Sequence, residues 1–202
     1  MALYCVVQAA IAGDLDADPE IVARVGILAE ASSSRMAFAW ATYTRGIAAS
    51  RSDLTEAAKL LRDTRDLAQP LGMVVLLLAC RAYGSVFEHS DDPVAALSGL
   101  GAALEEFADH RLPFELHSAM RDMLPAFAQL RRYEAVAVVD GAANAFAQRP
   151  AAARQAVTIA RVTLGDRAYE VVRERGRAMT DDELEAFLRE ELASISENRS
   201  VG

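Results

Sequence analysis

The chain has 202 residues, of which 52% are hydrophobic, 25% charged and only 6% aromatic, and its formal net charge is -8. This length and composition suit one globular domain or one short helical array with its own core. The negative charge argues against direct binding to the phosphate backbone of a nucleic acid. Abundant alanine and the near absence of alternating β-branched residues predict an all-α fold.

The chain begins with an apolar run, MALYCVVQAAIAG. No Lys or Arg precedes this run, so we interpret it as a buried first helix rather than a signal peptide. A second apolar run, 72–80, is much shorter than the ~18 residues that span a bilayer. Cys5 and Cys80 form no disulfide framework and indicate two buried thiols in a reducing compartment. We therefore expect a cytoplasmic protein with no membrane segment.

Three helices are predicted to begin with the same device, an acidic residue that caps the first turn. These starts lie at Asp18-Pro19-Glu20, at Ser52-Asp53 and at Asp91-Asp92-Pro93, and an apolar periodic segment follows each of them. More hydrophobic helices are predicted between them, over 36–48, 73–87 and 114–130.

Residues of the same type recur at a spacing of 38 to 40, as do Tyr43 and Tyr83, and Ala57, Ala95 and Ala135. This period is somewhat longer than the ~34 residues of a tetratricopeptide (TPR) unit. A single helix pair cannot bury its apolar face alone, so successive pairs stack. We predict a single domain over 1–202, a TPR-like α-solenoid of about four helix pairs within 1–148.

The C-terminal part is predicted to end the array with capping helices over about 150–195 and a frayed tail over 196–202. Pro150 begins a helix that reaches Leu164, and Gly165 and Gly176 are interpreted as left-handed helix C-caps. In the next helix, Thr180 and Glu183 form a capping box. Met179 and Leu184 are predicted to form the accompanying hydrophobic staple.

Charge changes sign along this C-terminal part. The segment 149–177 has seven arginines and three acids, whereas 178–202 has seven acids and two arginines. We predict that the two segments attract one another and pair within the molecule. The alternative is a basic docking face for an acidic partner or for an ATPase domain.

Three passages together resemble a known family: LAQPLG at 67–72, YEAVAVVDGAA at 133–143 and the stretch 164–192. They are similar to the C-terminal helical region of bacterial LuxR-type and AfsR-like (STAND) ATPase regulators, and of related mycobacterial proteins that fuse an adenylate-cyclase domain to such an ATPase. The third passage carries most of the likeness, at Leu164, Gly165, Tyr169, Gly176, Arg177, Met179 and Thr180. The resemblance implies a region that binds a protein partner or effector and relays its occupancy to a nucleotide-dependent switch.

Two parts of that family have no counterpart here. The chain contains no GxxxxGK[ST] motif, and its only lysine, Lys59, lies in the amphipathic segment EAAKLL, so ATP hydrolysis does not carry over. Only about 20 residues follow Met179, fewer than a LuxR-type DNA-binding domain needs. We expect no direct nucleic-acid binding.

The repeat register suggests one binding surface. Arg45, Arg81 and Arg121, with His117 one turn from Arg121, are predicted to line the concave face and to bind an anionic peptide or small effector. The alternative is that they are ordinary solvated or internally paired arginines. A second hypothesis is a small-molecule receptor with an apolar pocket near Trp40, Tyr43 and Tyr83, although these residues also suit a core.

The sequence gives no indication of catalysis. The three histidines, His89, His110 and His117, have no metal-ligand spacing. The acidic pairs 91–92 and 105–106 are interpreted as a helix cap and a solvated helix face. We predict no enzyme activity, no metal and no cofactor, with protein partners and with homodimerisation left open.

Overall fold

The structure is a computed structural model that describes residues 19–143 and 151–200. These residues form helices and connecting turns without any strand, which confirms the predicted all-α class. The predicted first helix and Cys5 lie outside the described residues. The sequence predicts a single domain, whereas the chain separates into two compact units, Met1–Glu88 and His89–Gly202, and we describe each by itself.

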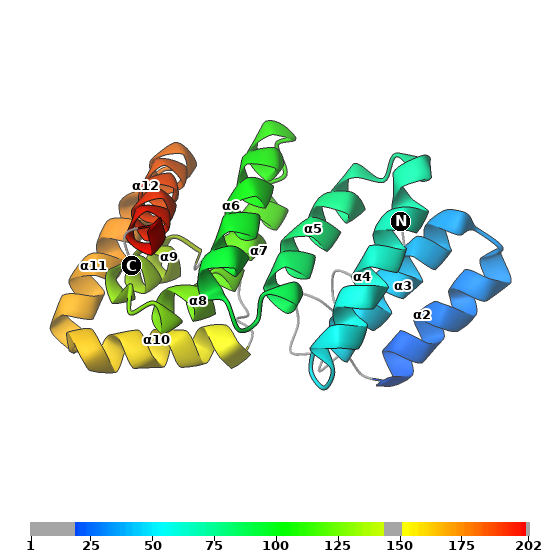
Figure 1. The fold of residues 1–202 in the computed structure, drawn as a ribbon, viewed down its shortest axis with the longest axis horizontal. Helices are drawn as coiled ribbons and strands as arrows, with labels where there is room; N and C mark the ends of the chain where they lie inside the picture. Colours follow the sequence, from blue (N-terminus) through cyan, green and yellow to red (C-terminus); the bar gives the residue numbers. More distant parts are fainter. Residues whose placement is uncertain (1–18, 144–150, 201–202) are drawn as a thin grey trace. The chain divides into compact units, whose positions relative to one another are not determined.

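The first unit is a row of consecutive helices (Figure 1). It contains α2 (Pro19–Ser32), α3 (Arg35–Ala49), α4 (Leu54–Ala68), a short 3-10 helix η1 (Gln69–Leu71) and α5 (Val74–Glu88). Each α-helix packs on the next in sequence. Tyr43, Leu61, Leu76 and Cys80 from three successive helices are buried in one core cluster. The unit is thus built from contacts that are short-range in the sequence.

Its helix boundaries follow from local residue chemistry. The carboxylate of Asp53 accepts a hydrogen bond from the Glu56 N–H at 2.9 Å and so caps α4. At the α4–α5 junction, Gly72 has φ 62 and ψ 32, the left-handed conformation that glycine adopts most readily. The predicted start at Asp18 lies outside the described residues.

The second unit is built around α9 and is less regular in its order (Figure 1). Its helices are α6 (Pro93–Asp109), α7 (Pro113–Asp122), α8 (Leu124–Gln129), α9 (Tyr133–Ala142), α10 (Ala151–Leu164), α11 (Asp166–Ala178) and α12 (Asp181–Ser200). The helix α9 contacts α8, α10, α11 and α12, and α12 also packs on α6. Residues 135–141 of α9 are all buried, so this helix forms the centre of the unit.

One predicted helix in this unit is wrong. The helix predicted over 114–130 is interrupted at Met123, because Pro125 has no N–H to donate to the Arg121 carbonyl. The helix α12 continues to Ser200, and the Ser196 hydroxyl donates to the Leu192 carbonyl at 3.0 Å; the predicted fraying of the tail from Ser196 stays a prediction. The start at Asp92 is as expected, since its carboxylate accepts from the Ala95 N–H at 3.1 Å.

Candidate functional site

The predicted arginine surface is not a uniform set. Arg45 and Arg81 are exposed in the first unit, whereas His117 and Arg121 share α7 in the second. Arg121 is only 6% exposed, and it donates to the Ser118 hydroxyl at 3.3 Å. Arg121 is thus not on an open surface, and its predicted role in partner binding stays a prediction. Ala41, Arg81 and Arg121 follow one another at intervals of 40 residues. Ala41 and Arg121 are buried, whereas Arg81 is exposed.

His117 has a contact within the molecule. Its Nε2 lies 3.4 Å from Oδ1 of Asp181, the first residue of α12, and its side chain is largely buried. This contact joins α7 to the N-terminal end of α12. His117 therefore helps to position α12.

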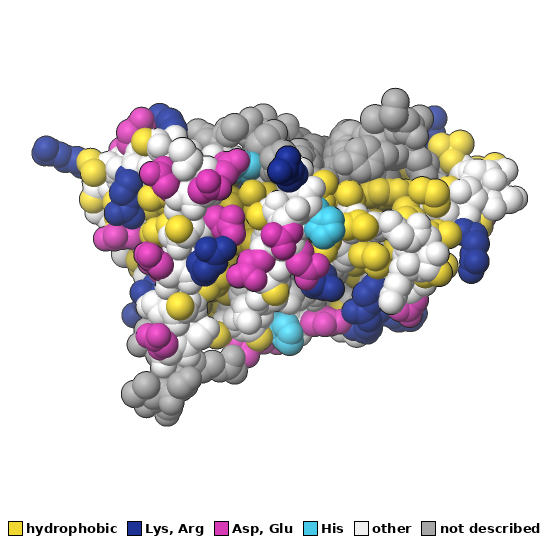
Figure 2. Space-filling view, turned by 90° about the horizontal axis from the view of Figure 1, so that it is seen from above, with side chains coloured by type: hydrophobic (Ala, Val, Ile, Leu, Met, Phe, Trp, Pro, Cys, Tyr) yellow, Lys and Arg dark blue, Asp and Glu magenta, His cyan; other side chains and the backbone are white. Residues whose placement is uncertain are grey.

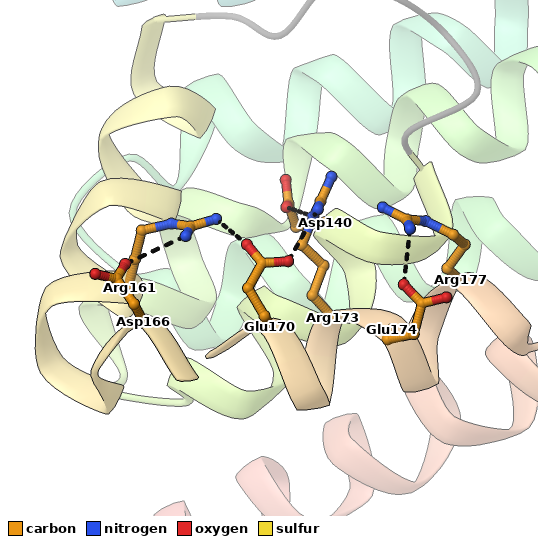
Figure 3. A network of polar contacts seen from close by, with 7 residues as sticks. All are labelled: Asp140, Arg161, Asp166, Glu170, Arg173, Glu174 and Arg177. Atoms are coloured by element: carbon orange, nitrogen blue, oxygen red, sulfur yellow. Dashed lines mark hydrogen bonds and ion pairs between the residues drawn. The ribbon is translucent and has the colours of Figure 1, made fainter. Parts of the chain in front are cut away.

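The arginine-rich segment forms a network of ion pairs around α11 (Figure 3). The Arg161 guanidinium contacts Asp166 and Glu170, and Arg173 contacts Glu170 at 3.2 Å and Asp140 of α9 at 2.8 Å. Hydrogen bonds, first from Arg161 and then from Arg173, lower the pKa of the Glu170 carboxyl despite the opposing effect of desolvation. The network ties α10, α11 and α9 together.

This pairing differs from the predicted attraction between 149–177 and 178–202. Arg161, Arg173 and Arg177 contact acids of their own segment, and Arg173 also reaches the buried Asp140. The acids of α12 pair elsewhere: Asp181 with His117, Glu185 with Arg189 and Glu191 with Arg132. Asp140 was not among the predicted site residues, and its signal in the sequence is a single acid at the end of the apolar run AVAVVD.

Three of the residues that carry the family likeness, Tyr169, Gly165 and Gly176, contribute to packing and to helix ends. Tyr169 is fully buried, with the Arg161 guanidinium 4.5 Å from its ring centroid. Gly165 ends α10 with φ 80, although its ψ of 146 lies outside the left-handed helical region. Gly176 differs from its prediction as a C-cap because it is buried inside α11. A Cβ at Gly176 would lie 2.0 Å from the Val138 carbonyl oxygen of α9.

The structure contains the capping box of the last helix. The Glu183 N–H donates to the Thr180 hydroxyl at 3.3 Å, and the Thr180 N–H donates to the Glu183 carboxylate at 2.8 Å. These two bonds satisfy backbone donors at the start of α12. Leu184 is buried and Met179 is half-buried, and their predicted staple contact stays a prediction.

The aromatic residues of the receptor hypothesis lie in a packed cluster. Trp40 and Tyr43 meet edge to face with centroids 5.9 Å apart, and Tyr43 and Tyr83 do so at 6.4 Å. Tyr43 is buried in the core of the first unit, and Trp40 and Tyr83 pack against that core. Phe38, two residues before Trp40, is exposed.

A groove that the sequence analysis did not predict lies between α6 and α12. Its volume is about 270 Å³, and its lining includes the buried side chains of Leu97, Leu104 and Leu188. Acidic side chains gather beside apolar ones over these helices in Figure 2. Ser98, Gly101 and Ala102 are small residues on the lining face of α6, and Leu192 of α12 packs so closely on Gly101 that a Cβ there would lie 2.6 Å from its Cδ1. Their spacing of three and four residues was the signal available in the sequence.

The charged residues of the groove lining are Glu105, Glu185 and Arg189. The guanidinium of Arg189 lies 2.5 Å from Glu185 and 3.7 Å from Glu105 and so bridges the two helices. Arg189 and Glu105 are mostly exposed and Glu185 is partly exposed, so water screens both ion pairs. The groove thus combines an apolar floor with a rim of net negative charge.

No three His, Cys, Asp or Glu side chains of residues 19–143 and 151–200 come together as metal ligands. Within the same ranges, no helix is both long and apolar enough to cross a bilayer. Burial raises the pKa of the Cys80 thiol to about 12, which makes this thiol a poor nucleophile.

Comparison of the chain with protein families, with curated proteins and with solved structures finds no match. The groove between α6 and α12 is therefore interpreted from its own geometry and charge. It is an open, partly apolar surface rather than a cluster of reactive groups. Such a surface suits recognition of another molecule.

Proposed function

We propose that this chain is a non-catalytic helical interaction domain that binds a protein partner in the groove between α6 and α12. The observation that carries the proposal is the groove itself, in which the exposed Ala102 and Ala193 and the partly exposed Val94 and Leu192 lie beside an acidic rim. Exposed apolar surface bordered by polar residues is typical of protein interaction sites. The interaction function is thus assigned to the second unit.

The dimensions of the groove favour a protein segment over a small molecule. Pockets for small ligands usually hold about 300–1,000 Å³ and enclose most of the ligand. This groove has about 270 Å³ and lies along two exposed helix faces. The alternative receptor hypothesis also loses support from the first unit, because Trp40, Tyr43 and Tyr83 pack against one another and the core.

We further propose that the chain is a TPR-like solenoid and part of a bacterial ATPase-type regulator. The consecutive packing of α2, α3, α4 and α5 supports the solenoid part, since each repeat of a solenoid contacts its sequence neighbours. The resemblance at 164–180 supports the regulator part. Under this proposal, the partner is the ATPase domain of the same regulator or another protein, and its binding is relayed to the nucleotide switch.

Two measurements test this proposal. The reading frame that encodes the chain should also encode an ATPase domain with a GxxxxGK[ST] motif, and its absence would remove the regulator assignment. Hydrogen exchange of the chain, with and without that purified ATPase domain, should show slower exchange in α6 and α12 when the domain is present. Unchanged exchange there, with saturating ATPase domain, would contradict the groove as the interaction site.

A further inference from the structure

We infer that the occupant of the groove between α6 and α12 is a basic amphipathic helix of a partner protein, an inference that rests on the proposed interaction function. The two walls run side by side, with Arg189 next to Glu105 and Leu192 next to Gly101. Higher residue numbers on α12 thus meet lower ones on α6, so the helices run in opposite directions. A groove between two helices commonly binds a third, amphipathic helix.

The length of the groove matches a short helical segment. The lining residues of α6 extend from Val94 to Glu105 and those of α12 from Glu185 to Ser196. At 1.5 Å per residue, each wall is roughly 17 Å long, about three helical turns. A partner helix of this length places apolar side chains on one face at spacings of three and four residues. A volume of about 270 Å³ accommodates a few such side chains rather than a whole ligand.

Charge determines the kind of helix. The sequence of α6 has three acids and no basic residue, and that of α12 has seven acids and two arginines. The two helices together therefore have a net charge of -8, which equals the net charge of the whole chain. The remaining residues sum to zero. The excess negative charge of the protein thus resides in the two helices that form the groove.

Part of this charge is compensated within the molecule. Asp181 contacts His117, Glu191 contacts Arg132, and Arg189 bridges Glu105 and Glu185. The rim has two carboxylates for one guanidinium, and exposed acids such as Glu190 and Asp109 lie on the same helices. A partner with Lys or Arg beside its apolar face complements this surface, whereas an acidic partner is repelled. The occupant is therefore a basic amphipathic helix.

The test uses a fluorescent peptide of about 14 residues, with leucines on one helical face and lysines elsewhere, and measures its anisotropy with the full chain at about 0.15 M salt. Two control peptides have the same leucine face with glutamates instead of lysines, or the same composition with the leucines dispersed. We expect saturable binding of the first peptide and at least about tenfold weaker binding of both controls. Equal binding of the glutamate peptide, or of the dispersed one, would overturn the inference.

A groove-filling variant locates the site. Ala193→Trp places a large side chain at an exposed position of the lining, and we expect it to weaken peptide binding at least about tenfold. The matched control is Val162→Trp on α10, an 80% exposed position, which should leave binding unchanged. Circular dichroism of both variants checks that the helices are intact. Unchanged binding by a folded Ala193→Trp protein would place the peptide elsewhere and overturn the inference.

Two outcomes separate this inference from the proposed function. If the peptide does not bind but the ATPase domain still slows exchange in α6 and α12, the interaction function stands and the partner class is wrong. If the peptide does not bind and the ATPase domain does not slow exchange, both the basic-helix inference and the proposed interaction function are wrong. A second copy in the groove would appear as a dimer in light scattering that Ala193→Trp converts to a monomer, and this result would also overturn the basic-helix assignment.

Discussion

At the scale of single residues, the ion pair between Asp140 and Arg173 is the most consequential polar contact of the second unit. Asp140 is 2% exposed, and its Oδ2 accepts from Nε of Arg173 at 2.8 Å. Removing one partner of a buried pair leaves a charge without compensation. We expect Asp140→Ala to lower the free energy of unfolding by about 3 kcal/mol in urea denaturation. This value is at the low end for a buried pair, because Arg173 keeps its second ion pair, with Glu170.

The matched control for Asp140→Ala is Glu174→Ala, which removes the exposed ion pair with Arg177. Exposed pairs contribute little, so the expected loss is less than about 1 kcal/mol. Replacing both partners, in Asp140→Leu with Arg173→Met, should recover much of the stability lost by Asp140→Ala. If the two single alanine variants are equally stable, the buried pair has no special contribution.

Cys80 gives a second prediction at this scale. Burial raises its pKa to about 12, so hardly any thiolate exists near pH 8. In a Cys5→Ser background, we expect the thiol of the folded protein to react with a disulfide reagent at least about 100-fold more slowly than the thiol of the urea-unfolded protein. A folded-state rate close to the unfolded rate would mean that α5 opens readily or that the thiol is accessible.

At the scale of helices, the contact between α9 and α11 depends on two glycines. A Cβ at Gly176 would lie 2.0 Å from the Val138 carbonyl oxygen, and one at Gly141 would lie 1.9 Å from the Arg173 carbonyl oxygen. These carbonyl oxygens belong to the backbone and cannot move aside as the end of a flexible side chain can. A Cβ at either glycine therefore forces α9 and α11 apart. We expect Gly176→Ala to cost about 3 kcal/mol of stability, measured by urea denaturation.

Gly84→Ala is the control for this prediction. Gly84 lies inside α5, and a Cβ there would meet no described atom within 4 Å. Alanine in a helix interior is favoured over glycine by about 0.5–1 kcal/mol, so this variant should be slightly more stable than the natural protein. A neutral Gly176→Ala would show that α9 and α11 do not cross as closely as the structure has them.

The start of α12 gives a prediction about pH. Hydrogen bonds from the Thr180 backbone and then its hydroxyl lower the pKa of the Glu183 carboxyl below its usual 4.5. A carboxyl with a lowered folded-state pKa stabilises the fold above its unfolded pKa, and this contribution is lost as pH falls through the folded pKa. The melting temperature of the natural protein should therefore fall more steeply below about pH 4.5 than that of Glu183→Gln, which keeps a neutral acceptor. Parallel pH profiles would contradict the capping role of the charged carboxylate.

The features that the sequence predicts well are those that depend on neighbouring residues. Asp53, Asp92 and Thr180 accept hydrogen bonds from N–H groups three residues onward, so a few adjacent letters suffice. Features that depend on distant residues were missed. Glycine is the usual residue at a helix C-cap, so Gly176 was predicted as one. Its actual role is to allow close contact with the backbone of Val138, which lies 38 positions earlier on a helix that the sequence does not place beside it.

The candidate site was missed for the same reason. The groove needs α6 and α12 side by side, although about 70 residues separate them. The small residues of α6 indicate a close contact with some helix, but nothing local shows that this helix is α12. The 40-residue spacing instead predicts a surface position for Arg121, which the packing of α7 buries. Periodicity gives the helices and their apolar faces, but which faces meet depends on tertiary packing in this second unit.

At the scale of the whole molecule, the division into two units predicts that the second folds by itself. The fragment 89–202 contains a complete core, in which α12 contributes the buried side chains of Leu184, Leu188 and Ile195. We expect this fragment to be helical by circular dichroism and to unfold cooperatively in urea. The shorter fragment 89–180 lacks those three side chains, whose burial contributes roughly 5 kcal/mol or more, comparable to the whole stability of a small domain. It should therefore lose cooperative unfolding. If 89–202 also fails to unfold cooperatively, the second unit depends on the first, and a continuous helical array describes the chain better than two units.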